Sequence, residues 1–91
     1  MTYYKFEVHH LKILPKFFEA VVSGNKTFEI RKKEDRDFKV GDCLIMHEIE
    51  PATAEYTGRK VWCVVQYLLD DPEYVKEGFV VMAIRQYQSV L

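Results

Sequence analysis

The chain has 91 residues, of which 48% are hydrophobic, 14% aromatic and 30% charged, and its formal net charge is −1 at pH 7. The length indicates a single domain, residues 1–91, with one modest core, and the composition excludes a disordered protein. Residues 1–41 carry nine Lys and Arg against six Asp and Glu, whereas residues 42–91 carry four against eight. This split permits a local basic face for an anionic ligand, but a mixed solvated surface fits it equally well.

Cys43 and Cys63 each stand alone in an apolar stretch. Without a C-x-x-C spacing or a signal peptide, the two cysteines indicate reduced core residues, and they predict neither a zinc site nor a disulfide framework. No apolar run approaches membrane-spanning length. We therefore expect a cytoplasmic protein without a metal, a cofactor or a membrane partner.

In chain order, the first predicted element is a loosely alternating strand, YKFEVHHLKI, over residues 4–13. A short amphipathic helix of about two to three turns follows at about residues 14–23. Pro15 suits its first turn, and Gly24 suits the position just beyond its end. The run GNKTFEIRK, residues 24–32, then predicts the second strand.

Side chains alternate between the two faces of a strand. In the second strand, Phe28 and Ile30 therefore share one face, which we expect to pack in the core. The opposite face carries Thr27, Glu29 and Arg31 and offers hydrogen-bond donors and acceptors to a ligand.

The rest of the chain predicts three apolar strands. A charged connection and a Gly41-Asp42 turn precede CLIMHEIE, residues 43–50, and the hairpin-type connection PATAEYTGR ends in Thr57-Gly58. Strands follow at residues 60–69 and 79–87, separated by Asp70-Asp71-Pro72 and by one expected helical turn in PEYVKEG.

These strands are too apolar for an open sheet with one solvated face. We therefore predict an α+β, mostly β fold, in which a curved sheet of five to six strands closes as a small barrel and the helix covers one side. The expected core contains Phe17, Phe18, Val21, Phe28, Ile30, Leu44, Val64, Val81 and Ile84.

The order strand, helix, GNKTFEIR and FKVGD resembles the ASCH domains of the PUA-like superfamily of small β-barrels. Their signature is a G-x-K-T-x-E-x-R run after the first helix and a GD turn downstream. The segment from HHLKI to YTGR looks like a bacterial and phage branch of that group, of unknown function, for which RNA binding is the expected role. The match covers nearly the whole chain and ends in GFVVMAIR.

The resemblance implies a PUA-like β-barrel with a cleft beside the helix cap that binds RNA or a nucleotide. Its lining would come from Lys26, Thr27, Glu29 and Arg31. Arg31 supplies a planar fork suited to a phosphate or a base edge, and Glu29 accepts from an exocyclic amine. The alternative is that Glu29 and Arg31 pair with each other or with a neighbouring strand.

Three further residues are candidates for the same cleft. His9 matches the histidine of an H-x-L-K-I pattern and either lines the cleft or is structural. Lys12 is either a phosphate contact or a solvated lysine. Arg36 is the best candidate for a phosphate contact in the charge-balanced loop KKEDRDFK, and His47 is expected to be structural because its neighbours are apolar.

Some small ASCH proteins are amidohydrolases that remove an acyl group from the exocyclic nitrogen of cytidine. They use a Lys, a Thr nucleophile three residues later and a Glu from a downstream helix. Aligned on G-x-K-T, the Lys falls on Lys26 and the nucleophile position on Glu29, where a carboxylate can act only as a general base. The stretch DDPEYVKEG, with Glu73 and Glu77, is too short for a long helix that would carry the third member. Binding is therefore favoured over catalysis, and a protein-interaction module is the third alternative.

Overall fold

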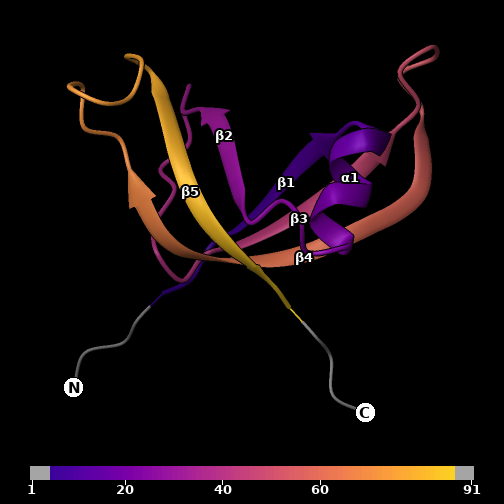
Figure 1. Ribbon diagram of the computed structural model, residues 1–91, viewed down its shortest axis with the longest axis horizontal. Helices are drawn as coiled ribbons and strands as arrows, with labels where there is room; N and C mark the ends of the chain where they lie inside the picture. Colours follow the sequence, from indigo (N-terminus) through magenta and orange to yellow (C-terminus); the bar gives the residue numbers. More distant parts are fainter. Residues whose placement is uncertain (1–4, 88–91) are drawn as a thin grey trace.

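The computed structural model describes residues 5–87. This part of the chain contains five strands and one helix, in the order β1 (Val8–Ile13), α1 (Pro15–Val22), β2 (Phe28–Lys32), β3 (Cys43–Ile49), β4 (Tyr56–Leu69) and β5 (Phe79–Gln86). The strands form one sheet in the spatial order β1-β3-β4-β5-β2. The sheet curls into a half-barrel, with α1 on its inner side (Figure 1). The expected mostly β fold with one helix is confirmed.

The half-barrel is open on one side because β1 and β2 are the two edges of the sheet. β1 runs parallel to β3, and all other neighbouring pairs are antiparallel. The long strand β4 pairs with β3 along its first part and with β5 along its second part. A register shift between Val65 and Tyr67 falls in that second part, and such irregularities bend a strand and increase its twist. The curl brings β1 and β2 to opposite sides of the opening.

The helix α1 confirms the expected helix, and the residues at its two ends explain where it begins and ends. Pro15 occupies the first turn, where its missing N–H and fixed φ cost nothing. Phe18 and Val21, three residues apart, are buried on one face, which packs against β3 and β4. Beyond the end, Gly24 has φ +83°, and the N–H of Lys26 donates to the carbonyl of Ala20 at 2.9 Å. At this turn the chain changes direction and leads into β2.

The predicted core is partly confirmed. Phe18, Val21, Leu44 and Ile84 are buried, and Val64 and Val81 are half-buried. The prediction is wrong for Phe17, Phe28 and Ile30, which are 41%, 44% and 55% exposed. The hydrophobic core itself consists of Leu11, Ile13, Phe18, Val21, Phe38, Leu44, Met46, Val61, Cys63, Val65, Val80, Met82 and Ile84.

The error at β2 concerns which face lies inside. Glu29 pairs with Met82 and Arg31 pairs with Val80, both fully buried residues of β5. Paired residues point to the same side of a sheet, so the polar face of β2 is the inner one. Alternation correctly separates the two faces, but β2 is an edge strand beside a cavity, so its apolar side chains Phe28 and Ile30 stay partly exposed and line that cavity.

Two strands begin at other residues than expected. β4 begins at Tyr56, so Thr57 and Gly58 lie in the strand. The turn itself spans residues 50–55, and the N–H of Ala54 donates to the carbonyl of Glu50 at 2.6 Å. The expected first strand starts later, at Val8, and its residue 4 lies outside the described part.

The segment between β4 and β5 contains one turn of helical type. It is closed by the N–H of Val75, which donates to the carbonyl of Asp71 at 2.9 Å. Within residues 5–87, no helix has the length and apolar character needed to cross a membrane.

Candidate functional site

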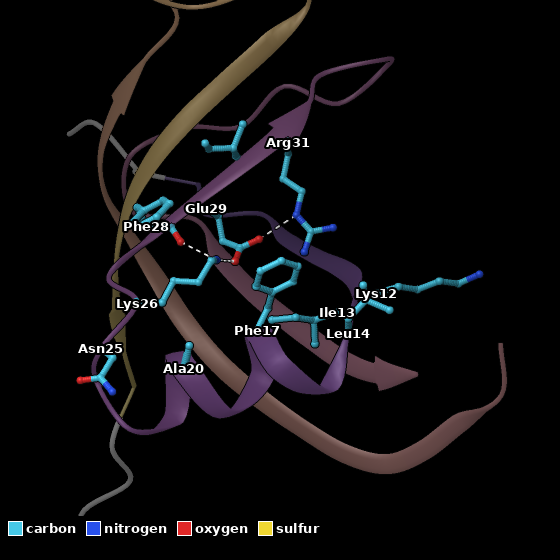
Figure 2. Close-up of a pocket in the computed structure, with 11 residues that line it drawn as sticks. Lys12, Ile13, Leu14, Phe17, Ala20, Asn25, Lys26, Phe28, Glu29 and Arg31 are labelled. Atoms are coloured by element: carbon cyan, nitrogen blue, oxygen red, sulfur yellow. Dashed lines mark hydrogen bonds and ion pairs between the residues drawn. The ribbon is translucent and has the colours of Figure 1, made fainter. Parts of the chain in front are cut away.

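A cavity of about 650 Å³ lies at the open side of the half-barrel, between the β1–α1 corner and β2. We call it the helix-side pocket. Figure 2 shows side chains from α1 on one side and from β2 on the other, converging on this space. Its lining consists of Lys12, Ile13, Leu14, Phe17, Ala20, Asn25, Lys26, Phe28, Glu29, Ile30 and Arg31. Drug-sized ligands occupy cavities of this volume.

A buried carboxylate lies in the wall of this pocket. Glu29 is only 3% exposed. Its Oε2 accepts a hydrogen bond from Nζ of Lys26, and its Oε1 accepts one from Nε of Arg31 at 2.8 Å. Lys26 Nζ also donates to the carbonyl of Phe28 at 2.6 Å. The two cations flank the carboxylate in Figure 2 and compensate its charge.

Apolar groups surround this ion trio. The Nζ of Lys26 lies 5.8 Å from the ring centroid of Phe17 and 5.1 Å from that of Phe28, distances typical of cation–π contacts. Ile13, Leu14 and other apolar residues complete the lining. The pocket therefore combines aromatic and aliphatic walls with one cluster of fixed hydrogen-bonding groups.

The trio borders the hydrophobic core. The terminal nitrogen of Arg31 lies 3.9 Å from the sulfur of Met46, a fully buried residue. Burial, together with the nearby negative charge of Glu29, raises the pKa of the Cys63 thiol to about 11. Both cysteines are free, and Cys63 is a core residue as expected.

A second cavity, of about 460 Å³, shares Lys12 and Arg31 with the first. We call it the basic pocket; its lining consists of His10, Leu11, Lys12, Arg31, Lys32, Glu34, Arg36, His47 and Tyr56. His10 Nδ1 and His47 Nε2 form a hydrogen bond of 2.9 Å. The two cavities follow one another along the gap between the edge strands.

Most of the predicted site residues lie at these two cavities. Lys26, Glu29, Arg31 and Lys12 line the helix-side pocket together. Arg36 lines only the basic pocket, where its Nη2 donates to the carbonyl of His10 at 3.2 Å. Glu29 and Arg31 pair with each other, as the alternative predicts, and the paired groups form part of the pocket wall.

Thr27 and His9 do not line the helix-side pocket. Thr27 is exposed, and its carbonyl accepts the N–H of Ile84 at the start of the β2–β5 pairing. His9 is buried against Phe38, with ring centroids 4.6 Å apart. Thr27 instead lines another cavity together with Lys26, and His9 has the structural role that was its alternative.

His9 belongs to a structural polar cluster around the Gly41-Asp42 turn. The fully buried Asp42 accepts hydrogen bonds from His9 Nε2 at 2.8 Å, from the N–H of Lys39 at 3.0 Å and from the N–H of Glu7 at 3.1 Å. Among residues 5–87, Glu7, His9 and Asp42 are the group whose donor atoms lie close enough to hold a metal ion. Because both oxygens of Asp42 are already engaged by these donors, the cluster is best explained as a turn anchor.

A second buried carboxylate, Glu48, lies toward the end of β3. Its Oε1 accepts from Thr57 Oγ1 at 2.7 Å and from Arg59 Nε at 2.9 Å, and its Oε2 accepts from Arg59 Nη2 at 2.7 Å. These bonds, chiefly those from Arg59, lower the pKa of Glu48. Arg59 also donates to Glu19 of α1 at 2.7 Å, so this network fastens the helix to the sheet.

Several residues that line the cavities carry no functional signal in the sequence. Phe17 follows the helical spacing expected of a core residue, yet it lines the helix-side pocket. His47 and Tyr56 line the basic pocket, although His47 was expected to be structural. The parallel register that places His47 beside Lys12 connects strands far apart in the chain, and no local pattern encodes it.

The fold and the cavities together define a small half-barrel domain with a ligand-sized cleft at its open edge. The chain belongs to the family described as a domain of unknown function, DUF3850, whose model matches residues 8–84. It is similar to an uncharacterized 12.9 kDa protein from the GpA 3′ region of Escherichia phage P2, with 35% identity over 71 residues. That match covers 78% of this chain and 62% of the relative, so the chain spans less than two thirds of the relative's length.

Proposed function

We propose that this domain binds RNA or a nucleotide and places a base in the helix-side pocket. The observation that carries the proposal is the Glu29 carboxylate, held between Lys26 and Arg31 in the wall of an otherwise apolar pocket. Burying charged groups is costly, and a hydrophobic replacement often serves stability as well or better. A compensated carboxylate beside an open cavity is therefore better explained by recognition than by stability.

The trio has the hydrogen-bonding capacity that a base edge requires. An ionised carboxylate offers about four acceptor positions, and Lys26 and Arg31 occupy only part of them. Glu29 can therefore still accept from an exocyclic amine such as N4 of cytosine. Arg31 donates to Glu29 through Nε, which leaves its terminal nitrogens to donate to a ring acceptor or carbonyl.

The walls of the pocket suit the faces of a base. Phe17 and Phe28 are both partly exposed and lie on either side of the Lys26 ammonium. Stacking on aromatic side chains is a general means of binding unpaired bases. The resemblance to ASCH domains implies the same class of ligand, and membership of DUF3850 leaves the ligand open.

Hydrolysis of an N-acylated nucleoside is the alternative that the geometry favours less. Both oxygens of Glu29 already accept from cationic donors, so a reaction that protonates the carboxylate would disrupt its ion pairs with Lys26 and Arg31. Thr27, the hydroxyl nearest in sequence, does not line the pocket. If the domain were an enzyme, Lys26 and Glu29 would be its catalytic residues, with Lys26 stabilising the developing negative charge.

A titration with RNA, single-stranded DNA and free nucleosides at two salt concentrations tests the proposal. We expect single-stranded RNA to bind with a salt-sensitive affinity, because phosphate contacts release counterions. Cytidine should bind more weakly but with little dependence on salt. Turnover of an N-acylated cytidine would support the hydrolase instead. The absence of both binding and turnover would favour a protein-interaction module.

A further inference from the structure

The basic pocket contains an unusual concentration of cations without acidic partners. Lys12, Lys32 and Arg36 line it, and within residues 5–87 none of the three forms an ion pair. Lys33 and Lys39, in the same stretch of chain, do form ion pairs, with Asp70 and Asp37. The single acidic residue of the lining is Glu34. The electrostatic potential in the basic pocket is therefore positive.

A hydrogen-bonded histidine pair lies in this positive field. The rings of His10 and His47 are stacked with centroids 5.2 Å apart, and Nδ1 of His10 bonds to Nε2 of His47 at 2.9 Å. The remaining ring nitrogens, Nε2 of His10 and Nδ1 of His47, are the pair's other donor or acceptor positions. The cationic neighbours make the pocket unsuited to a metal cation, although two imidazoles at this distance are otherwise reasonable ligands.

We propose that the basic pocket binds a phosphate group and that binding is coupled to uptake of a proton by the His10–His47 pair. The source of the phosphate rests on the proposed function: it is the phosphate attached to the nucleoside in the helix-side pocket. Continuity supports this link, because Lys12 and Arg31 belong to both linings. Arg36 and Lys12 supply the charged donors that phosphate recognition requires.

The coupling follows from the groups that face His47. Burial, then His10 across the hydrogen bond and Lys60 on β4, lower its pKa. Lys12 is its pairing partner on β1, and the rings of His47 and Tyr56 lie edge to face with their centroids 5.8 Å apart. A bound phosphate supplies the negative charge that these neighbours lack.

These neighbours determine in which direction the affinity for the anion changes with pH. Without an anion, the pKa of His47 lies below its ordinary value. A bound anion stabilises the protonated form of His47, so its pKa rises on binding. Proton uptake therefore accompanies binding, and affinity increases as the pH falls between the two pKa values, by at most about tenfold per pH unit for one proton.

Sulfate and cytidine, titrated separately into the full chain, test the proposal. Sulfate keeps a constant charge through the histidine range, so any change in affinity reports on the protein. We expect NMR signals of Lys12, Arg36 and His47 to shift with sulfate, the histidine pKa to rise on saturation, and the affinity to increase from about pH 8 to about pH 5.5. Sulfate affinity that is independent of pH, or signals that shift elsewhere, would overturn the proposal.

Single substitutions test whether the pH-dependent binding of sulfate takes place in the basic pocket. His47→Gln and, independently, His10→Gln should remove the pH dependence, and Arg36→Ala should weaken sulfate binding about tenfold. Lys39→Ala, outside the pocket, is the matched control and should leave sulfate affinity unchanged. A pH dependence that persists in both histidine variants would refute the coupling.

The two ligands separate this inference from the proposed function. Binding of sulfate without binding of cytidine would refute the proposed function and leave an anion site. Binding of cytidine without binding of sulfate would overturn the anion site alone. Cytidine monophosphate should bind more tightly than cytidine, and this gain should vanish in Arg36→Ala. Equal affinities for the two in the wild type would contradict the assignment of one ligand to both pockets.

Discussion

Glu29 and Arg31, two residues apart on β2, point into the half-barrel and are joined by a hydrogen bond of 2.8 Å from Nε to Oε1. This bond fixes the orientation of the guanidinium and holds the carboxylate in the pocket wall. A site whose groups are held in place before the ligand arrives loses less entropy on binding. The relationship therefore connects the stability of β2 with its proposed role in recognition.

Neutralising Glu29 should destabilise the fold. In Glu29→Gln, the charge that compensates Lys26 and Arg31 disappears, and the free energy of unfolding should fall by about 1–3 kcal/mol. Urea unfolding followed by circular dichroism measures the change. Glu55→Gln, at an exposed glutamate, is the control and should change stability by less than about 0.5 kcal/mol. Equal stabilities of the two variants would show that the trio is not compensated as described.

Removing the guanidinium should weaken binding of the ligand. Arg31→Ala should reduce the affinity for a cytidine-containing RNA by about 1–3 kcal/mol, because a bidentate contact to a base or phosphate is lost. Isothermal titration calorimetry gives the affinities. Lys39→Ala, whose lysine pairs with Asp37 outside both cavities, should have a far smaller effect. Equal losses in the two variants would indicate binding through general charge alone.

Substitution at Glu29 also tests the hydrolase alternative. Glu29→Thr introduces a hydroxyl where the ASCH amidohydrolases, which the sequence resembles, place their nucleophile. It should create little activity, because the single turn between β4 and β5 is too short for a helix that would carry the downstream acid. The wild type should likewise fail to deacylate N-acylated cytidine, as followed by chromatography of the products. Robust hydrolysis by the wild type that Glu29→Gln abolishes would make Glu29 a general base.

The Glu48 network predicts how stability depends on acid. Hydrogen bonds from Arg59 and Thr57 lower the pKa of Glu48 in the folded protein. A lowered pKa contributes stability that is complete above the unfolded value, about 4.3, and that is lost as the pH falls through the folded value. Arg59→Met should raise the folded pKa of Glu48, so less of this stability remains to be lost in acid. Thermal unfolding of both proteins between about pH 7 and pH 3 measures the difference, and parallel profiles would contradict it.

Burial of Cys63 predicts that its thiol is unreactive in the folded protein. Its pKa is raised to about 11 by burial and by Glu29, and only the thiolate reacts readily with disulfide reagents. At about pH 8, mass spectrometry should find Cys63 unlabelled in the native protein and labelled after unfolding in guanidinium chloride. Rapid labelling of native Cys63 would contradict its position in the core.

Much of the fold is predictable from local patterns. Helical spacing and the flanking Pro15 and Gly24 define α1, and runs of β-branched and aromatic residues define β3 and β5. Alternation also places Glu29 and Arg31 on one face of β2. Which face lies inside depends on the pairing of β2 with β5 at the edge of the sheet, a long-range contact that the alternation does not contain.

For the site, too, local patterns predict the residues that lie close in sequence but not those brought together by long-range contacts. Lys26, Glu29 and Arg31 of the G-x-K-T-x-E-x-R run lie at one pocket, as their local spacing predicts. The sequence leaves two roles open for His9, because its partner Asp42 lies 33 residues away along the chain. In the basic pocket, the sequence singles out Lys12 and Arg36 but not the histidine pair, since the parallel pairing of β1 with β3 brings His10 and His47 together.

The most direct test of the proposed function is a comparison of cytidine with uridine by NMR of the wild-type protein. The two nucleosides differ at the group expected to face Glu29, since cytidine carries an amine where uridine carries a carbonyl. We expect cytidine to shift the backbone signals of residues 26–31 and of Phe17, and uridine to shift them more weakly. Cytidine signals that map to the outer face of β4, or equal responses to the two nucleosides, would contradict recognition by Glu29.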